Sequence, residues 1–398
     1  CLSFSLSLMS LKLRSKNDWG RLDMTSEWNH FALGEITELV IDYRGKTPKK
    51  LGGDWCKQGY RALSAKNIKT GRIVQAETIR YIDESLYRKW MKDEVQRGDI
   101  LITSEAPFGQ IFFWDSDEKI VLSQRLFCVR IKPEYDARFI YYYMTTPEFQ
   151  SELDGRATGT TVIGLRQPEL MKCVIRCPEI QEQKVIAAIL SSIDAKIIAN
   201  EKVNDNLQQQ AQAIYSSMFI DNPDPAWSHG HLSDLITVKY GKDHKKLADG
   251  IYPVYGSGGI MRYVERPLYN KESVLIPRKG TLNNVMYVNQ PFWSVDTMFY
   301  TEMKLPNVAK FVYHFVKAKD LASMNAGSAV PSMTTDILNA MEVVIPSASA
   351  LEEFESLVAP MYEAMEANDV QSKALSQMRD TLLPKLMSGE IDVSDIQL

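Results

Sequence analysis

The hydrophobic residues of this chain follow a helical period over two long segments and a shorter, strand-like alternation elsewhere. From residue 179 to 220 the sequence contains no Gly or Pro, and apolar residues recur at helical spacing. One heptad position of this segment holds Ile186, Ile193, Asn200, Leu207 and Ile214. The pattern predicts a single helix, roughly 60 Å long, that must bury its apolar stripe against a second helix.

The segment 347–390 supplies that second helix. At the same heptad position it holds Phe354, Met361, Asn368, Leu375 and Leu382. Pro360 interrupts the pattern, so this proline either kinks the helix or lies before a late start. The alternative, in which each helix packs only on its own globular domain, stays open at this point.

Asn200 and Asn368 are the polar members of the two stripes, and each lies midway along its helix. In an antiparallel pair related by a pseudo-two-fold axis, both residues come near that axis. We expect the two amides to bond each other or a shared water, so that neither is buried without a partner. The alternative is that one or both side chains turn to solvent.

The segments that precede the two helices predict short strands. GDILITS (98–104) and IVLSQRLFCVRI (120–131) are rich in β-branched and apolar residues, and Gly and Pro punctuate the surrounding sequence. Their counterparts later in the chain are SVLIP (273–277) and FWSVDTMFY (292–300). Each of the two segments therefore predicts a mixed sheet with small helices.

The chain repeats itself in this order of elements. At an offset of 199 residues, Trp28 and Leu33 match Trp227 and Leu232, and FIYYYM (139–144) resembles FVYHFV (311–316). Around the long helices the matching offset is 168, as for Pro178 and Pro346. The fall from 199 to 168 implies that the second copy has lost about thirty residues of loop.

We therefore predict an α+β fold with two mixed α/β domains in tandem repeat. Two long helices, packed as an antiparallel coiled coil, separate them with pseudo-two-fold symmetry. The predicted segments are an N-terminal tail (1–27), the first domain (28–178), the first long helix (179–220), a linker (221–228), the second domain (229–346), the second long helix (347–390) and a C-terminal tail (391–398).

Composition and charge add two points. The five cysteines are odd in number and scattered, which indicates reduced thiols and a cytoplasmic protein, and no apolar run is long enough to span a bilayer. The net charge is −4, but residues 28–178 hold 23 Lys and Arg against 20 Asp and Glu, and residues 229–346 hold 13 against 10. Two mildly basic segments therefore alternate with two acidic ones, and local charge decides where phosphate can dock.

Catalytic motifs are missing from the sequence. It has no Gly-rich phosphate loop, no H-E-x-x-H and no G-x-S-x-G elbow. His229 and His231 lack an acidic or thiol partner at metal-binding spacing, and His30 and His229 occupy equivalent repeat positions that favour a structural role. We predict no catalytic residue and no metal ligand in this chain.

Basic clusters recur at matching places in both copies, interleaved with tyrosines, which favours phosphate contacts over merely solvated loops. In the first copy the candidate DNA-binding residues are Arg44, Lys46, Lys49, Lys50, Arg61, Lys66, Lys69 and Arg72. In the second copy they are Lys239, Lys242, Lys245, Lys246, Arg278 and Lys279. The matched loops ATGTTVIGLR (157–166) and NAGSAVPSM (325–333) add the hydroxyls of Thr160, Thr161 and Ser328, although both loops could equally be tight turns.

Together these features resemble the specificity subunit of type I restriction-modification systems, from about Trp28 to Ile391. The opening W-x4-L-x-[ED]-[IL] occurs in both copies, as does a G-[TS] loop before a strand that ends in Pro. The most specific segments are PEIQEQKVIAAIL (178–190) and LLPKLMSGEI (382–391). The chain departs from the family in its N-terminal tail, in Pro360 and in 347–358, which lacks the Gln-Lys of the first copy.

The resemblance implies that each globular repeat is a target recognition domain that reads one half of a bipartite site in double-stranded DNA. The helices would act as a spacer and help recruit two methyltransferase subunits, which bind S-adenosylmethionine and methylate adenine N6. Two motor-endonuclease subunits would complete the complex, so that S-adenosylmethionine, ATP and Mg belong to the partners and this chain holds no cofactor. Two alternatives remain: a DNA-modifying enzyme with a divergent active site, and a coiled-coil scaffold that does not bind DNA.

Overall fold

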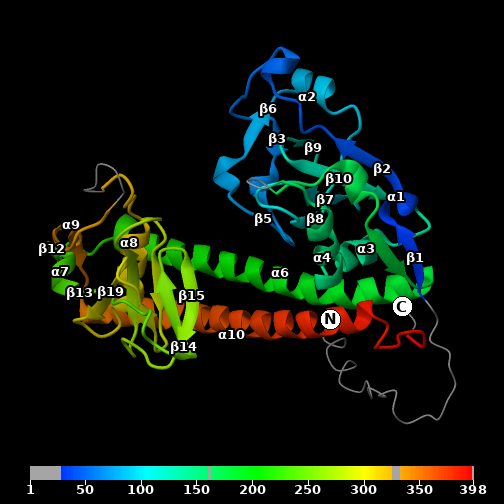
Figure 1. Cartoon of the computed structure of the whole chain (residues 1–398). Coiled ribbons are helices and arrows are strands. Elements are labelled where there is room, and N and C mark those ends of the chain that lie inside the picture. The colour runs from blue at the N-terminus through cyan, green and yellow to red at the C-terminus, as the bar shows by residue number, and fades with distance from the viewer. Residues whose placement is uncertain (1–27, 160–162, 325–331, 397–398) are drawn as a thin grey trace, which may run out of the picture. The chain divides into compact units, whose positions relative to one another are not determined.

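The computed structural model describes residues 28–159, 163–324 and 332–396. The predicted tail at 1–27 and the candidate residues Thr160, Thr161 and Ser328 lie outside the described residues. The chain forms two compact units: unit 1 comprises Cys1–Ala195 with Leu375–Leu398, and unit 2 comprises Lys196–Ala374. Each unit therefore contains a mixed domain and parts of both long helices (Figure 1).

Unit 1 is built on a four-stranded sheet in the order β2-β10-β7-β8, with smaller sheets β6-β3-β9, β1-β11 and β4-β5. Its strands are β1 (Asn29–Ala32), β2 (Thr37–Asp42), β3 (Tyr60–Leu63), β4 (Ile68–Lys69), β5 (Arg72–Ile73), β6 (Arg80–Ile82), β7 (Ile100–Thr103), β8 (Ile111–Phe113), β9 (Ile120–Leu122), β10 (Leu126–Ile131) and β11 (Val174–Cys177). Its short helices are α1 (Leu33–Ile36), α2 (Glu84–Trp90), α3 (Ala137–Met144), α4 (Pro147–Arg156) and α5 (Gln167–Leu170).

Unit 2 repeats these sheets in the orders β13-β19-β16-β17, β15-β14-β18 and β12-β20. Its strands are β12 (Ser228–His231), β13 (Ile236–Tyr240), β14 (Asp249–Gly256), β15 (Gly259–Val264), β16 (Ser273–Pro277), β17 (Met286–Val288), β18 (Trp293–Ser294), β19 (Met298–Met303) and β20 (Glu342–Ile345). Its short helices are α7 (Leu232–Leu235), α8 (Ala309–Lys317) and α9 (Thr335–Asn339).

The matching strand orders confirm the predicted tandem α+β repeat. In both units the three-stranded sheet has one antiparallel and one parallel pairing about its central strand, β3 in unit 1 and β14 in unit 2. The lost residues lie mainly before β7 and β16: residues 64–99 join β3 to β7, whereas only 257–272 join β14 to β16. Unit 1 uses this length for the β4–β5 hairpin and for α2, which have no counterparts in unit 2.

The four-stranded sheet of each unit lies between two hydrophobic cores. In unit 1, Ile100 and Ile102 of β7 pack into one core, and Leu101 between them packs into the other. Residues 274–276 of β16 divide in the same way in unit 2. Successive side chains of a strand point to opposite faces, so the unbroken apolar runs in these strands follow from burial on both sides.

The two long helices are α6 (Ile180–Ser216), which ends in a π-helical turn at Ser217–Asp221, and α10 (Ala348–Met387). Pro360 lies inside α10, so the expectation of a late start is wrong. Pro360 and Ser356, whose carbonyl oxygen the proline cannot engage, are both exposed, and water can therefore satisfy that oxygen. Segments of both helices contribute to the main core of each unit, so the helices pack on each other and on the domain together.

The predicted helix-pairing residues differ in burial. Ile186, Ile193, Asn200 and Phe354 are buried, whereas Leu207, Ile214, Met361, Asn368, Leu375 and Leu382 are half-buried. Within unit 2 the helices run antiparallel, because contacts to α10 occur at lower residue numbers as α6 proceeds from Asn200 to Asn204. This antiparallel packing decides which polar side chains of the two helices bond each other.

Asn200 and Asn368 come close but do not pair as we expected. The buried Asn200 amide nitrogen donates to Gln371 Oε1 at 2.9 Å, to Ser372 Oγ at 3.1 Å and to the backbone oxygen of Asn368 at 3.4 Å. The Asn368 amide nitrogen instead donates to Asn204 Oδ1 at 2.8 Å. The prediction of a direct bond between the two amides is therefore wrong, because antiparallel helices bring together heptad positions that are not equivalent.

A polar contact at equivalent repeat positions joins each domain to a long helix. In unit 1, the Tyr142 hydroxyl of α3 donates to Asp194 Oδ2 at 2.7 Å, and Asp194 Oδ1 accepts from Arg379 at 2.8 Å. In unit 2, His314 Nε2 of α8 lies 2.9 Å from the Tyr362 hydroxyl. Tyr142 and His314 are both the fourth residue of the matched segments FIYYYM and FVYHFV, so the two domains attach to their helices in corresponding ways.

Candidate nucleic-acid interface

The first basic cluster follows β2, and its neighbours tie down part of it. The Arg44 guanidinium donates from Nε and Nη2 to the two carboxylate oxygens of Asp42, at 2.8 Å each, and from Nη1 to the backbone oxygen of Leu165 at 3.3 Å. Its Cζ lies 4.0 Å from the centre of the Phe127 ring. Arg44 therefore anchors the loop after β2, and little of its hydrogen-bonding capacity remains for DNA.

Lys46 is also engaged inside the protein. Its Nζ lies 3.8 Å from the centre of the Tyr43 ring and donates to the backbone oxygen of Trp90 at 2.5 Å. Burial, with a smaller contribution from the nearby charge of Lys92, lowers the pKa of Lys46. Lys49 and Lys50, one turn further on, are exposed, and Lys50 Nζ donates to Gly45 O at 2.9 Å. The outward cations of this cluster are therefore at its C-terminal end.

The second cluster of unit 1 surrounds the β4–β5 hairpin. Arg61 is paired in bidentate fashion with Glu118, whereas Lys66, Lys69 and Arg72 are exposed. The buried Asn67 holds this segment in place. Its Oδ1 accepts from the Ser64 backbone and hydroxyl at 3.1 and 2.9 Å, and its Nδ2 donates to Gln75 O at 3.2 Å and to Thr78 Oγ1 at 3.0 Å.

Gln110 fixes the tip of the same hairpin to the four-stranded sheet. Its Oε1 accepts from the Thr70 backbone at 3.0 Å and from the Thr70 hydroxyl at 3.2 Å, and Gly71 N donates to Ile111 O at 3.0 Å. Gly71 has a φ of +75°, which a glycine adopts without strain. Lys69 and Arg72 therefore project from a turn whose backbone is held at both ends.

In unit 2, the first basic cluster occupies the loop between β13 and β14. Lys239 lies on β13, with its Nζ 3.8 Å from Glu302, while Lys242, Lys245 and Lys246 are exposed. Gly241 permits this loop to leave the sheet, because a Cβ there would lie 2.0 Å from the Val295 carbonyl oxygen. Three of the four cations predicted here are thus exposed on a loop whose backbone passes close to the segment around Val295.

The structure brings the second basic pair of unit 2 beside this loop. Arg278 follows β16, and its Cζ lies 5.4 Å from the centre of the exposed Tyr240 ring at the end of β13. Arg278 Nη1 donates to Asp296 O at 3.2 Å. Lys279 is exposed and forms a β-bridge with Ser332. Two clusters that are far apart in the sequence therefore share one side of the domain.

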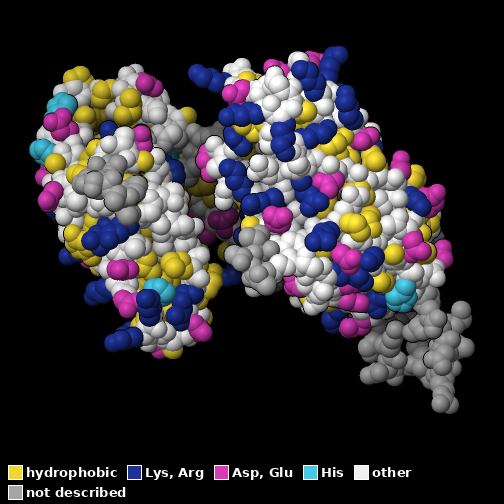
Figure 2. Space-filling model, turned by 45° about the horizontal axis from the view of Figure 1, so that its top comes forward, with side chains coloured by type: hydrophobic (Ala, Val, Ile, Leu, Met, Phe, Trp, Pro, Cys, Tyr) yellow, Lys and Arg dark blue, Asp and Glu magenta, His cyan; other side chains and the backbone are white. Residues whose placement is uncertain are grey.

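Unit 1 presents its cations on the end that carries β3, β6 and α2. Figure 2 turns this end, labelled in Figure 1, toward the viewer and shows Lys and Arg side chains spread over it. The sequence prediction missed Arg80 of β6, which is exposed and stacked at 3.9 Å on the Trp55 ring. No local charge cluster marks it, and only the pairing of β6 with β3 reveals its position.

Other charged and polar side chains are buried or half-buried beside the cores. The Arg130 guanidinium donates to both oxygens of Asp99 at 2.9 Å, and side-chain hydrogen bonding to Asp99 raises the pKa of Arg130. In unit 2, Lys310 is buried and donates to Glu355 at 2.5 Å. Burial lowers the pKa of His314 to about 4, which keeps this imidazole neutral at pH 7.

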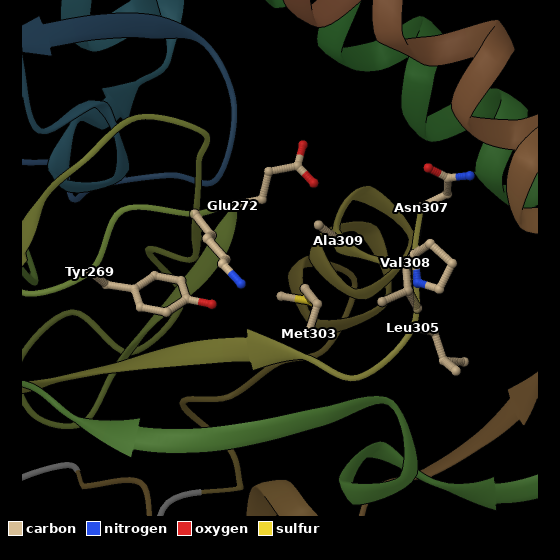
Figure 3. A pocket seen from close by; sticks show the side chains of 9 residues that line it. Tyr269, Glu272, Met303, Leu305, Asn307, Val308 and Ala309 are labelled. Carbon is tan, nitrogen blue, oxygen red and sulfur yellow. The ribbon is translucent and has the colours of Figure 1, made fainter.

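A small pocket in unit 2 lies where β19 leads into α8. Tyr269, Glu272, Met303, Leu305, Asn307, Val308 and Ala309 line it, together with Lys271 and Pro306 (Figure 3). Its volume of about 250 Å³ is below the usual range of small-molecule sites. Among the described residues, no three His, Cys, Asp or Glu side chains gather as metal ligands, and no helix is long and apolar enough to cross a membrane.

Comparison with known proteins decides the family. The model of the type I restriction modification DNA specificity domain matches residues 25–209 and 226–353. The chain belongs to this family. The specificity subunit of the MjaIX type I restriction enzyme of Methanocaldococcus jannaschii is 24% identical over 344 residues, which cover 75% of this chain and 79% of that protein. The HindI specificity subunit of Haemophilus influenzae is 20% identical over 418 residues, covering 75% of this chain and 88% of that protein.

A solved structure supports the fold of this specificity subunit. The S subunit of a type I restriction-modification system from M. genitalium superimposes with a TM-score of 0.59 at 18% identity, over 92% of this chain and 98% of that one. Specificity subunits are the non-catalytic components that recognise the DNA target. The alternatives of a DNA-modifying enzyme and of a scaffold that does not bind DNA are therefore wrong.

Proposed function

We propose that this specificity subunit reads a bipartite site in double-stranded DNA, with one half-site for each unit. The observation that carries the proposal is the recurrence of exposed cations on equivalent loops. Lys49 lies between β2 and β3 of unit 1, and Lys242 and Lys245 lie between the equivalent strands β13 and β14 of unit 2. Two domains with the same strand order thus carry exposed positive charge on equivalent loops between strands.

Within each half-site, the exposed lysines would contact phosphate, which fixes the domain on the duplex without reading sequence. Base recognition would fall to side chains that a rigid support holds in one orientation. The buried Asn67 and the hydrogen bonds of Gln110 give the β4–β5 hairpin that kind of support in unit 1. In unit 2 the glycine at 241 lets the basic loop begin directly against the sheet.

We further propose that two methyltransferase subunits and two motor-endonuclease subunits assemble with this chain. The methyltransferases would supply S-adenosylmethionine and methylate adenine N6, and the motor subunits would supply the ATP and Mg chemistry. Support for recruitment by the long helices comes from their exposed apolar side chains: Ile198 and Val203 on α6, and Val370 and Met378 on α10. A partner subunit packed along the helices would cover these side chains.

The test is reconstitution of the full chain with methyltransferase subunits of a type I restriction-modification system. Genomic or plasmid DNA methylated by the complex would be sequenced for modified adenines. We expect methylation at one bipartite motif, and none from either component alone. Methylation at an unsplit motif, or by the purified chain alone, would contradict the proposal.

A further inference from the structure

Arg80 differs from most arginines of unit 1 in having no carboxylate partner. Its guanidinium lies over the Trp55 ring, with Cζ 3.9 Å from the ring centre, and the side chain is exposed. Within the part of the chain that the structure describes, no Asp or Glu lies at ion-pair distance from it. Arg44 and Arg138 also lie over aromatic rings, but both are held by aspartates. The donors of Arg80 are therefore uncommitted.

The support beneath Arg80 is rigid. Trp55 packs on the fully buried Trp90 with ring centres 6.3 Å apart, and Trp90 Nε1 donates to Leu122 O at 3.1 Å. The backbone nitrogen of Cys56, next to Trp55, donates to Tyr81 O, next to Arg80, at 2.9 Å. The segments that carry the indole and the guanidinium are thus bonded to each other, so the stack is formed before any ligand arrives.

A stacked guanidinium keeps its N–H donors in one plane with its outer edge facing solvent. That planar fork matches the O6 and N7 acceptors of guanine in the major groove, the commonest specific contact that arginine makes with DNA. Lys69 of the β4–β5 hairpin and Lys66, in the turn just before it, are exposed; they need no such orientation and suit phosphate. We propose that Arg80, oriented by Trp55, reads a guanine in the half-site of unit 1. This inference rests on the proposed function.

Unit 2 provides an internal comparison. Arg80 lies opposite Ala62 of β3, and Arg262 occupies the comparable place on β15, opposite Val254 of β14. Arg262, however, donates to Asp249 Oδ1 at 2.7 Å and to Leu247 O at 3.0 Å. The guanidinium that has no carboxylate partner in unit 1 is paired through Nη2 in unit 2, so we expect the guanine contact in one half-site only.

The experiment uses the full chain assembled with its methyltransferase subunits, and it compares the methylated motifs of wild type, Arg80→Ala, Arg80→Lys and Trp55→Leu. We expect Arg80→Ala to relax discrimination at one G·C pair of one half-site by roughly tenfold or more, and to leave the other half-site unchanged. Arg80→Lys keeps the charge but not the fork, so it relaxes the same position. Trp55→Leu acts at the same position more weakly.

Arg88→Ala is the matched control, because Arg88 is an exposed arginine of the same domain whose guanidinium is paired with Glu84. It should leave the motif unchanged, and thermal unfolding should show that all variants fold. Uniform weakening at every sequence with a shallower salt dependence would make Arg80 a phosphate contact and overturn the proposal, as would an unchanged motif in Arg80→Ala. If wild type methylates no bipartite motif, the proposed function fails, and this inference fails with it.

Discussion

The predicted cations of unit 1 carry the same charge but have different surroundings. Arg44 and Arg61 are bound to carboxylates, and Lys46 is drawn onto Tyr43 and a backbone oxygen. Lys66 and Lys69 are exposed, in the turn before the β4–β5 hairpin and in the hairpin itself. Substitution of each cation should therefore show whether it stabilises the fold or contacts DNA.

The double variant Lys66→Ala/Lys69→Ala should weaken DNA binding across all sequences and reduce the slope of log affinity against log salt by about two. Each lost phosphate contact releases about one fewer counterion, which gives that magnitude. Binding measured at several salt concentrations checks it. Equal salt slopes in wild type and the double variant would show that the two lysines are merely solvated.

Arg44→Ala should instead lower the free energy of unfolding by about 1–3 kcal/mol, because it leaves Asp42 without its partner.

His314 makes the stability of unit 2 depend on pH. Its Nδ1 lies 2.8 Å from Gln212 Oε1, and burial lowers its pKa from 6.5 to about 4. The folded state therefore favours the neutral imidazole, and its contribution is complete above pH 6.5 and lost as pH falls toward 4. Over that interval wild type should lose up to about 3 kcal/mol more than a His314→Gln variant, which cannot titrate. Unfolding by denaturant at pH 7, 6, 5 and 4 measures the difference.

The exposed His229 gives the matched control, because His229→Gln should follow the wild-type pH dependence. A His314→Gln variant that loses stability in parallel with wild type from pH 6.5 to 4 would contradict the assignment. Its expected lower stability at pH 7 does not affect the test, since only the slope against pH is compared.

Sequence reasoning located the basic clusters but not the role of each cation. Clusters such as 44–50 and 239–246 are visible because their charge is local in the sequence. The carboxylate that neutralises a cation is often remote, as Glu118 is from Arg61, and only the pairing of strands brings the two together. Arg80 illustrates the converse, because its partner is an aromatic ring 25 positions earlier and no charge pattern marks it.

Among the elements, the long helices were the easiest to predict. A stripe at heptad spacing, uninterrupted by Gly or Pro, identifies a helix by local pattern alone, and α6 spans Ile180–Ser216 within the predicted 179–220. The polar contacts between helices were harder, because they depend on a stagger that the repeat does not specify. The strands of the domains were predicted as a class, while their order in each sheet arises from long-range pairing.

The Asn204–Asn368 bond makes a prediction about helix register. Because Asn368 Nδ2 donates to Asn204 Oδ1, a double-mutant cycle with Asn204→Ala and Asn368→Ala should give a coupling energy of about 0.5–1.5 kcal/mol. The matched cycle with Asn200→Ala and Asn368→Ala should give much less, since their contact uses the Asn368 backbone. Chemical unfolding of the single and double variants measures both. A larger coupling energy for Asn200 and Asn368 than for Asn204 and Asn368 would instead support a direct bond between the Asn200 and Asn368 amides.

At the scale of the whole molecule, each unit has its own pair of hydrophobic cores and its own basic loop. Replacement of residues 229–346 by the corresponding segment of another family member should therefore change one half of the recognised motif and leave the other half intact. Methylome sequencing of the reconstituted complex checks this. A replacement that alters both halves together would show that the units do not recognise DNA independently.

The division of the chain between the units has a consequence for biosynthesis. Unit 2 is one continuous stretch, Lys196–Ala374, whereas unit 1 also needs Leu375–Leu398. Leu386, Met387 and Val393 of that last stretch are buried in the main core of unit 1. All of unit 2 therefore leaves the ribosome before Leu386, Met387 and Val393 do, and unit 1, although most of it is synthesised earlier, keeps part of its apolar core uncovered for longer. The half of the molecule that is made first is completed last.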